Sequence, residues 1–218
     1  MTSLRQTRLL LSPNERLVVA GARGTGKTEV AKTALKEIET DRKIDVMYLV
    51  HNLANANIDP SLNPTVFSYD ELEHLTLRID TDEELVVVFD DYLPRSDPRI
   101  REIIRQLFED PVKFNVTLIL VQQVFDSVMS FNPDYLIYTS LNSESVNKSI
   151  WKKLKLNNLY LDTDQSTFFR SFSKYNFFMA HIKENECKSC FICDRDANEM
   201  VSTAELNQLQ ENQPEQLN

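Results

Sequence analysis

Glycine is scarce in this 218-residue chain, and its distribution is uneven. The chain has three glycines, all within the stretch GARGTGKT at 21–28, whereas ordinary usage of about 7% would give roughly 15 spread through many turns. Glycine is needed where the backbone adopts left-handed angles or lies very close to another group. The scarcity elsewhere therefore makes 21–28 the most informative stretch of the sequence.

Disulfide patterns, long apolar runs and excess positive charge are also lacking. The three cysteines are odd in number and lie near the C-terminus, which does not fit a secreted disulfide framework and favours a reducing, cytosolic setting. No run approaches the roughly 18 apolar residues of a membrane span. The first residues lack the features of a signal peptide. We therefore expect a protein that is not secreted and has no transmembrane segment.

The net charge of −9 limits contact with nucleic acid. Neutralisation of phosphates by Lys and Arg supplies most non-specific affinity for DNA. An acidic monomer is therefore a poor DNA-coating protein. A ring with an acidic outside and a locally basic channel remains compatible with this charge.

Short apolar runs alternate with amphipathic stretches along most of the chain. The pattern predicts an α/β fold, a three-layer domain with a mostly parallel central sheet flanked by helices. We expect one domain over 1–201 and a disordered polar tail over 202–218. The predicted strands cover 16–20, 46–50, the start of 64–75, 84–91, 115–123, 134–140 and 174–182, and the predicted helices cover 28–40, the rest of 64–75, 97–110 and 143–156.

The glycine stretch matches the phosphate-binding motif G-x-x-x-x-G-K-[ST], with a predicted strand before it and a predicted helix after it. Such a loop, or P-loop, wraps a diphosphate in backbone N–H groups and leads into a helix N-terminus that favours anions. Lys27 is expected to reach the β- and γ-phosphates of ATP, and the Thr28 hydroxyl to bind Mg²⁺. The predicted nucleotide-binding residues are Gly21, Ala22, Arg23, Gly24, Thr25, Gly26, Lys27 and Thr28.

A buried strand ending in two carboxylates, VVVFDD, predicts the second half of a magnesium site. Asp90 is the expected metal partner, and Asp91 is placed to orient or deprotonate the attacking water. The alternative is a pair of acidic residues that begin a turn. The strand TLILVQQ also ends in polar side chains, and if it lies beside the Asp-Asp strand, Gln122 would hold the water or sense the γ-phosphate. Gln123 is the second choice, and ordinary strand-end polarity is the alternative to both.

Three blocks of sequence resemble the viral genome-packaging ATPases of the poxvirus, large-DNA-virus and virophage type, which belong to the FtsK–HerA superfamily. The blocks are LVVAGARGTGKTEVAKTAL, VVVFDDYLPRSDPRIREIIRQLF and NVTLILVQQVFDSVMSFNPDYLIY, together about residues 16 to 140. Two details depart from the family. The stretch EDPVKFNV lacks the Gly-Arg-His-like step that many members have, and Asn132 is present without the arginine that usually precedes it.

The resemblance implies an ATP-driven motor that packages viral double-stranded DNA into preformed capsids. It implies a homo-oligomeric ring with ATP and Mg²⁺ at subunit interfaces and a capsid, portal or membrane-vertex protein as partner. The expected location is the viral assembly site in the host cytoplasm, or the virion. It also implies an arginine donated in trans, and the candidates are Arg95, Arg99, Arg101 and Arg105. Each arginine has the alternative of a solvated or intrahelical ion pair.

Two other functions compete with the motor. A P-loop kinase of nucleosides or nucleotides would usually need a mobile lid with arginines, in place of an Asp-Asp strand followed by a Gln-Gln strand. A nucleotide-dependent scaffold would bind ATP without moving DNA. Fold alone does not separate these classes.

Two further features each have a functional and a purely structural interpretation. Residues 147–158 form the one locally basic stretch, with Lys148, Lys152, Lys153 and Lys155 around Trp151; it would contact DNA phosphates or simply form a solvated helix face. Four soft ligands lie within thirteen residues: His181, Cys187, Cys190 and Cys193. They would bind zinc, or the cysteines would be free and buried.

Overall fold

The computed structural model describes residues 11–41, 45–50, 64–71, 84–92, 98–123, 132–140, 143–154, 165–170, 177–183, 186–193 and 200–202. The chain divides into two compact units. One covers residues 8–137 and the other contains the chain from 138 onward.

The unit over 8–137 is built on a parallel sheet. Its strands lie in the order β3-β2-β4-β5-β1-β6, and the pairs β1–β5, β5–β4, β4–β2 and β2–β3 are all parallel. The mostly parallel sheet predicted from the apolar runs is confirmed. The elements are β1 Arg16–Ala20, α1 Lys27–Asp41, β2 Asp45–Val50, β3 Thr65–Ser68, the 3₁₀ turn η3 Tyr69–Glu71, β4 Leu85–Tyr92, α3 Pro98–Glu109, β5 Val116–Gln122 and β6 Tyr135–Tyr138.

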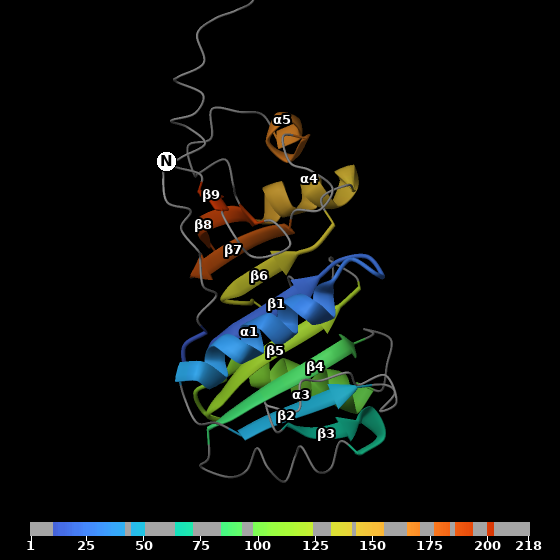
Figure 1. Cartoon of the computed structure of the whole chain (residues 1–218), viewed down its shortest axis with the longest axis vertical. Coiled ribbons are helices and arrows are strands. Elements are labelled where there is room, and N and C mark those ends of the chain that lie inside the picture. The colour runs from blue at the N-terminus through green and yellow to red at the C-terminus, as the bar shows by residue number, and fades with distance from the viewer. Residues whose placement is uncertain are drawn as a thin grey trace, which may run out of the picture. The chain divides into compact units, whose positions relative to one another are not determined.

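The central strands are buried on both faces, which is why they appear in the sequence as continuous apolar runs. All seven residues of β5 and the first five of β4 are buried. Helices α1 and α3 lie on opposite faces of the sheet (Figure 1). Helix α1 buries Ala31, Ala34, Leu35 and Ile38, and helix α3 buries Ile100, Ile104, Leu107 and Phe108. The predicted three-layer α/β architecture is therefore confirmed.

Parallel pairing gives the sheet two chemically different edges. The carboxyl ends of β1, β3, β4 and β5 meet at one edge, which we call the carboxyl edge. The amino ends of the same strands meet at the opposite, or amino, edge. Ligands of open α/β sheets bind outside the carboxyl ends of the strands, so the carboxyl edge is where a site is expected.

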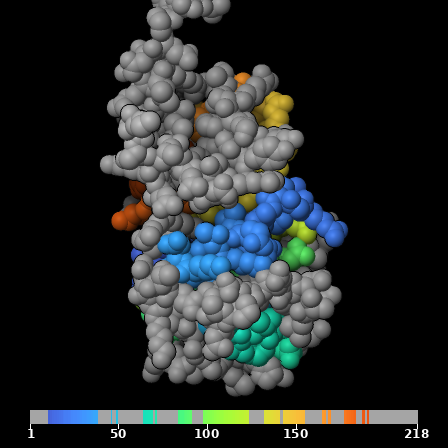
Figure 2. Space-filling model, in the orientation of Figure 1, coloured from blue at the N-terminus to red at the C-terminus, as the bar shows by residue number. Residues whose placement is uncertain are grey.

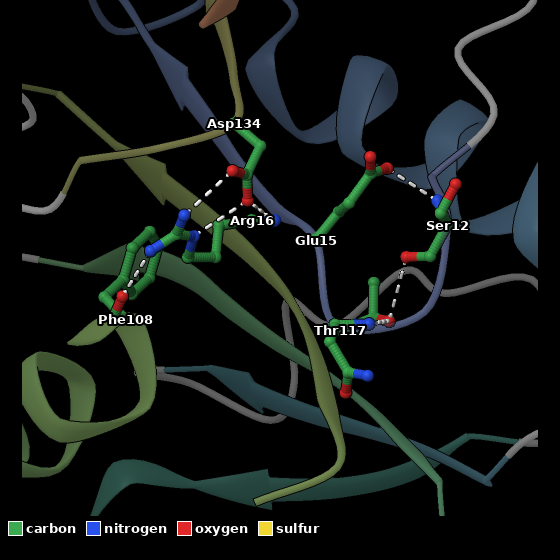
Figure 3. A network of polar contacts seen from close by, with 7 residues as sticks. Ser12, Glu15, Arg16, Phe108, Thr117 and Asp134 are labelled. Carbon is green, nitrogen blue, oxygen red and sulfur yellow. Dashed lines mark hydrogen bonds and ion pairs between the residues drawn. The ribbon is translucent and has the colours of Figure 1, made fainter. Parts of the chain in front are cut away.

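At the amino edge, a network of hydrogen bonds and an ion pair around Arg16 connects neighbouring elements (Figure 3). The Asp134 carboxylate accepts hydrogen bonds from the Arg16 backbone N–H at 2.9 Å and from Nε and Nη2 at 2.8 Å each. Arg16 Nη1 donates to the Phe108 carbonyl at 2.6 Å. Nearby, the Asn14 N–H donates to Thr117 Oγ1 at 3.0 Å. These contacts join the start of β1 to the end of α3, the start of β5 and the residue before β6.

The C-terminal unit contains α4 Glu144–Lys153, α5 Gln165–Arg170, β7 Phe177–Lys183, β8 Glu186–Cys193 and β9 Met200–Ser202. The pairs β7–β8 and β8–β9 are antiparallel. The core of this unit is aromatic: Trp151 contacts Phe168 and Phe169 with ring centroids 5.6 and 6.1 Å apart. Helix α4 and strand β7 were predicted from the sequence, whereas α5, β8 and β9 were not.

Several predictions fall at or beyond the limits of the described chain. The helix expected after β3 is a 3₁₀ turn over Tyr69–Glu71, and 72–75 lie outside the described residues. Ser202 belongs to β9, so the predicted tail does not begin there, and 203–218 lie outside the described residues. Arg95 and Lys155 lie outside them as well.

Within the described part of the chain, no helix combines the length and the apolar character needed to cross a membrane.

Candidate functional site

The glycine loop joins the end of β1 to the start of α1 at the carboxyl edge. Gly24 and Gly26 have φ angles of +75° and +87°, in the left-handed region that residues with a side chain disfavour. A Cβ atom built at either position would meet no atom within 4 Å. The two glycines are therefore required by backbone angle, not by a lack of room. The exposed loop and α1 form the blue surface in Figure 2.

Two side chains of the loop converge on one of its carbonyl groups. Thr25 Oγ1 donates to the Ala22 carbonyl at 2.7 Å, and Lys27 Nζ donates to the same oxygen at 2.8 Å. The Val30 N–H donates to the Gly26 carbonyl at 3.0 Å, which begins the hydrogen-bond ladder of α1. The N–H groups that start a helix lack intrahelical acceptors, so this end of α1 favours an anion.

Lys27 is a buried cation. Only 8% of the residue's surface is exposed to solvent. Burial lowers the pKa of Lys27, and the nearby carboxylates of Asp91 and Asp90 partly offset that effect by raising it. The site thus holds a positive charge that is incompletely compensated, and binding of a polyanion would be favoured there.

Thr28 and Asp90 bring two oxygen ligands together from different elements. Thr28 Oγ1, in the first turn of α1, donates to Asp90 Oδ1 of β4 at 3.3 Å. Octahedral Mg²⁺ bonds oxygens at about 2.0–2.1 Å, so adjacent ligands lie about 3 Å apart. The hydroxyl and the 9%-exposed carboxylate are hard donors of the kind that Mg²⁺ prefers. The residues present therefore fit a magnesium ion.

Asp91 lies at an irregularity of β4. The register between β4 and β5 shifts between Phe89 and Tyr92, and Asp91 has a φ of +54°, which is uncommon for a residue other than glycine. Gln123 Nε2 donates to Asp91 Oδ1 at 2.8 Å. Backbone angles of this type cost of order 1–3 kcal/mol and concentrate at functional sites.

The strand that carries the two glutamines lies between β4 and β1, as the glutamine hypothesis requires. Gln122, the preferred candidate from the sequence, is fully buried and pairs with Ala20 of β1. Gln123 is the glutamine whose side chain contacts Asp91. The structure therefore brings the second-choice residue to the aspartate pair.

The candidate arginines of α3 differ in their contacts. Arg105 binds Glu102 through two hydrogen bonds at 2.6 and 2.9 Å and also pairs with Glu109. Hydrogen bonds from Arg105 and then Gln106 lower the pKa of Glu102 to about 2. Arg105 thus forms the intrahelical ion pairs given as its alternative. Arg99 and Arg101 are exposed on the same helix.

The basic stretch contributes lysines but no available tryptophan. Lys152 and Lys153 are exposed in the last turn of α4, and Lys148 pairs with Glu144 at 2.9 Å. Trp151 packs against Phe168 and Phe169, so its ring stabilises the C-terminal unit.

Three of the four candidate zinc ligands do not lie on one face of the β7–β8 pair: His181, Cys187 and Cys190. In the β7–β8 register, His181 lies opposite Ser189, whereas Ala180 lies opposite Cys190 and Ile182 opposite Cys187. Cross-strand partners share a face and successive residues alternate, so His181 lies on the other face from both cysteines. Among the residues with described side chains, no three His, Cys, Asp or Glu are grouped to hold a metal ion.

The other alternative for the cysteines agrees with these contacts. Cys187 and Cys190 are buried thiols that are not joined in a disulfide. A hydrogen bond with Cys187, and then burial, raise the pKa of the Cys190 thiol.

One residue at this edge was not identified from the sequence. Tyr69, in η3, donates its hydroxyl to the Asp90 carbonyl at 3.1 Å. Its only sequence signal was a place just after a short predicted strand, which gave no reason to connect it with the Asp-Asp strand.

Strand β1 of the parallel sheet enters a G-x-x-x-x-G-K-T loop and a helix, and β5 separates it from the Asp-Asp strand β4. This arrangement defines the P-loop NTPase fold. Among solved structures, the chain is similar to B204, the DNA-packaging ATPase of Sulfolobus turreted icosahedral virus. The TM-score is 0.56 at 16% identity, over 84% of this chain and 98% of that chain.

Two further similar structures are of the genome-packaging NTPase B204 from Sulfolobus turreted icosahedral virus 2. The complex with AMP has a TM-score of 0.55 at 16% identity, over 81% of this chain and 98% of that chain. The complex with ATP-gammaS has a TM-score of 0.54 at 16% identity, over 80% and 96%. The fold expected from the resemblance to packaging ATPases is therefore confirmed. Comparison with protein-family models gives no match, and neither does comparison with curated proteins.

Proposed function

We propose that this protein is an ATPase that drives viral double-stranded DNA into preformed capsids. The observation that carries the proposal is the approach of Thr28 Oγ1 to Asp90 Oδ1 at 3.3 Å beside the glycine loop. This arrangement lies on a fold shared with a DNA-packaging ATPase and with a packaging NTPase solved in complex with ATP-gammaS.

In this proposal the loop 21–28 binds the triphosphate of ATP through its backbone N–H groups and the start of α1. Lys27 exchanges its contact with the Ala22 carbonyl for the β- and γ-phosphates, whose charge compensates the buried ammonium. Thr28 and Asp90 hold Mg²⁺, directly or through water. Held by these two residues, Mg²⁺ would supply positive charge that neutralises the charge developing on the phosphates during transfer.

Asp91 is the proposed general base. Its carboxylate would accept a proton from the water that attacks the γ-phosphate, which forms phosphate and releases ADP. The hydrogen bond from Gln123 Nε2 fixes one carboxylate oxygen at 2.8 Å. Gln123 therefore orients the base, and Gln122 remains the alternative residue for sensing the γ-phosphate from within the strand.

The ring, its arginine and its partners follow from the same proposal. An arginine from a neighbouring subunit would stabilise transition-state charge and raise turnover by about 10³–10⁵-fold. The ion pairs of Arg105 with Glu102 and Glu109 favour Arg95, Arg99 or Arg101 for this role. Lysines of α4, with exposed Lys152 and Lys153, would face the DNA. A capsid, portal or membrane-vertex protein would anchor the ring in the host cytoplasm or the virion.

Stimulation of hydrolysis by duplex DNA tests the proposal. ATP hydrolysis is measured with double-stranded DNA, with nucleoside or nucleotide acceptors, and alone, with Lys27→Ala as the inactive control. Light-scattering mass is measured with an ATP analogue and duplex together. We expect stimulation by the duplex and a ring-sized mass. Phosphoryl transfer to a small acceptor would identify a kinase, and a persistent monomer with no response to DNA would contradict the motor.

A further inference from the structure

The two aspartates of β4 lie where the regular register of the strand with its neighbours changes. Pairing with β2 ends at Phe89, opposite Leu49. Pairing with β5 runs to Phe89 and resumes only at Tyr92. Asp90 and Asp91 therefore lie where the regular register of β4 ends, and Asp90 is only 9% exposed. A buried backbone carbonyl is normally satisfied by a hydrogen-bond donor.

Tyr69 supplies that donor from a distant part of the sheet. Its hydroxyl donates to the Asp90 carbonyl at 3.1 Å in a buried contact. Its ring stacks on Phe89 with centroids 6.5 Å apart and planes 18° apart, and the residue is only 7% exposed. Because the strand order is β3-β2-β4, Tyr69, which follows β3, extends past β2 to hydrogen-bond the Asp90 carbonyl near the end of β4.

The turn that carries Tyr69 is itself fixed. One Glu71 oxygen, Oε2, accepts hydrogen bonds from the Ser68 N–H at 3.0 Å and from Ser68 Oγ at 3.2 Å. A carboxylate that binds back to the residue preceding a helical turn satisfies the donors there and sets its direction. In the sequence SYDE, the hydrogen bonds between Ser68 and Glu71 therefore fix the turn that contains Tyr69. This turn, η3, follows the edge strand β3 (Figure 1).

We propose that Tyr69 is a positioning residue for the metal-binding aspartate. This inference depends on the proposed function, because it assigns Mg²⁺ to Thr28 and Asp90. The Tyr69 hydroxyl and ring hold the backbone of Asp90 where its Oδ1 faces Thr28 Oγ1. Groups that orient metal ligands typically change metal affinity by 10- to 100-fold when removed. Loss of the hydroxyl therefore weakens magnesium binding while the phosphate-binding loop stays intact.

The test measures binding, so that it does not depend on catalysis. A fluorescent, non-hydrolysable ATP analogue is bound at a series of Mg²⁺ concentrations, and the Mg²⁺ midpoint for tight binding is determined. Tyr69→Phe removes one oxygen atom, and we expect it to raise the midpoint about 10-fold and to leave the affinity measured without Mg²⁺ unchanged within about 2-fold. Tyr135→Phe makes the same chemical change in β6 and is expected to leave the midpoint at the wild-type value.

The outcomes separate this inference from the proposed function. Wild-type protein without any Mg²⁺-dependent nucleotide binding overturns both. A normal wild-type midpoint with the same midpoint in folded Tyr69→Phe overturns the inference alone. If thermal unfolding shows that Tyr69→Phe does not fold, Glu71→Ala is used instead, because it removes the acceptor of both Ser68 hydrogen bonds and keeps the tyrosine. A raised midpoint in that variant supports the inference, and an unchanged midpoint overturns it.

Discussion

The two edges of the parallel sheet are built from the ends of the same strands but on opposite principles. At the amino edge, Arg16 and Asp134 form a bidentate ion pair with side chains only 21% and 25% exposed, and Arg16 also binds the Phe108 carbonyl. At the carboxyl edge, Lys27 is buried and burial lowers its pKa. Backbone strain does not distinguish the edges, because Asn14 and Asn115 at the amino edge have positive φ angles, as Asp91 has at the carboxyl edge. The difference is in charge: Arg16 and Asp134 are paired directly, whereas the effect of burial on Lys27 is only partly offset by Asp91 and Asp90.

The largest expected effect comes from removing the buried cation at the carboxyl edge. We expect Lys27→Met to lower ATP hydrolysis by at least about 10²–10³-fold, because a preorganised group that stabilises transferring phosphate is lost. The same change should leave the free energy of unfolding of the nucleotide-free protein unchanged or raise it by about 1 kcal/mol, because an incompletely compensated buried charge disappears. Hydrolysis assays and urea unfolding check the two parts.

The pH dependence of that stability has a defined sign. The Lys27 pKa is lower in the folded state, so the unfolded chain binds more protons between the folded pKa and the ordinary value of 10.5. Stability contributed by Lys27 therefore rises with pH in that window. The advantage of Lys27→Met should shrink as pH rises through it. An advantage that grows with pH would contradict the burial argument.

A smaller effect, on stability alone, is expected at the amino edge. Asp134→Ala leaves the partly buried Arg16 guanidinium without its carboxylate, and we expect a loss of about 2 kcal/mol in the free energy of unfolding. Nucleotide affinity should stay within about 2-fold, because the change lies at the opposite ends of the strands. Urea unfolding and fluorescent-nucleotide binding measure the two quantities. A large loss of affinity with intact stability would remove the contrast between the edges.

The smallest expected effect distinguishes the two glutamines. Gln123→Ala frees the Asp91 carboxylate, and we expect kcat to fall about 10-fold, equivalent to about 1.4 kcal/mol, with KM unchanged. The near-isosteric Gln122→Met should lower stability more than kcat, because Gln122 is fully buried within β5. Steady-state kinetics and thermal unfolding of both variants measure these effects on kcat and on stability. The opposite order of effects on kcat would assign the role to Gln122.

The sequence was sufficient for features whose signals are local. The glycine loop, the helix after it and the Asp-Asp strand each depend on a few adjacent residues. The mostly parallel sheet followed from apolar runs. Which glutamine meets Asp91 was not predictable, because side chains alternate along a strand and a local register shift changes their direction. Tyr69 was missed for a related reason: its contact with Asp90 depends on the order β3-β2-β4, which no local pattern encodes.

The C-terminal cysteines left two interpretations open, metal binding and burial in the core. Their close spacing drew attention to metal binding, whereas the segment forms strand β8, with Cys187 and Cys190 buried. Cysteine serves both as a metal ligand and as a small core residue, so spacing alone does not separate the two. Strand pairing decided the question by placing His181 on the other face.

The single tryptophan of the chain gives the molecule a built-in optical reporter. Trp151 packs against Phe168 and Phe169, so its emission will follow the melting of the C-terminal unit. A fluorescent nucleotide will follow the unit over 8–137. Monitoring both signals through one denaturant series would reveal whether the halves of this protein lose their structure together or one after the other, with no label attached to the polypeptide.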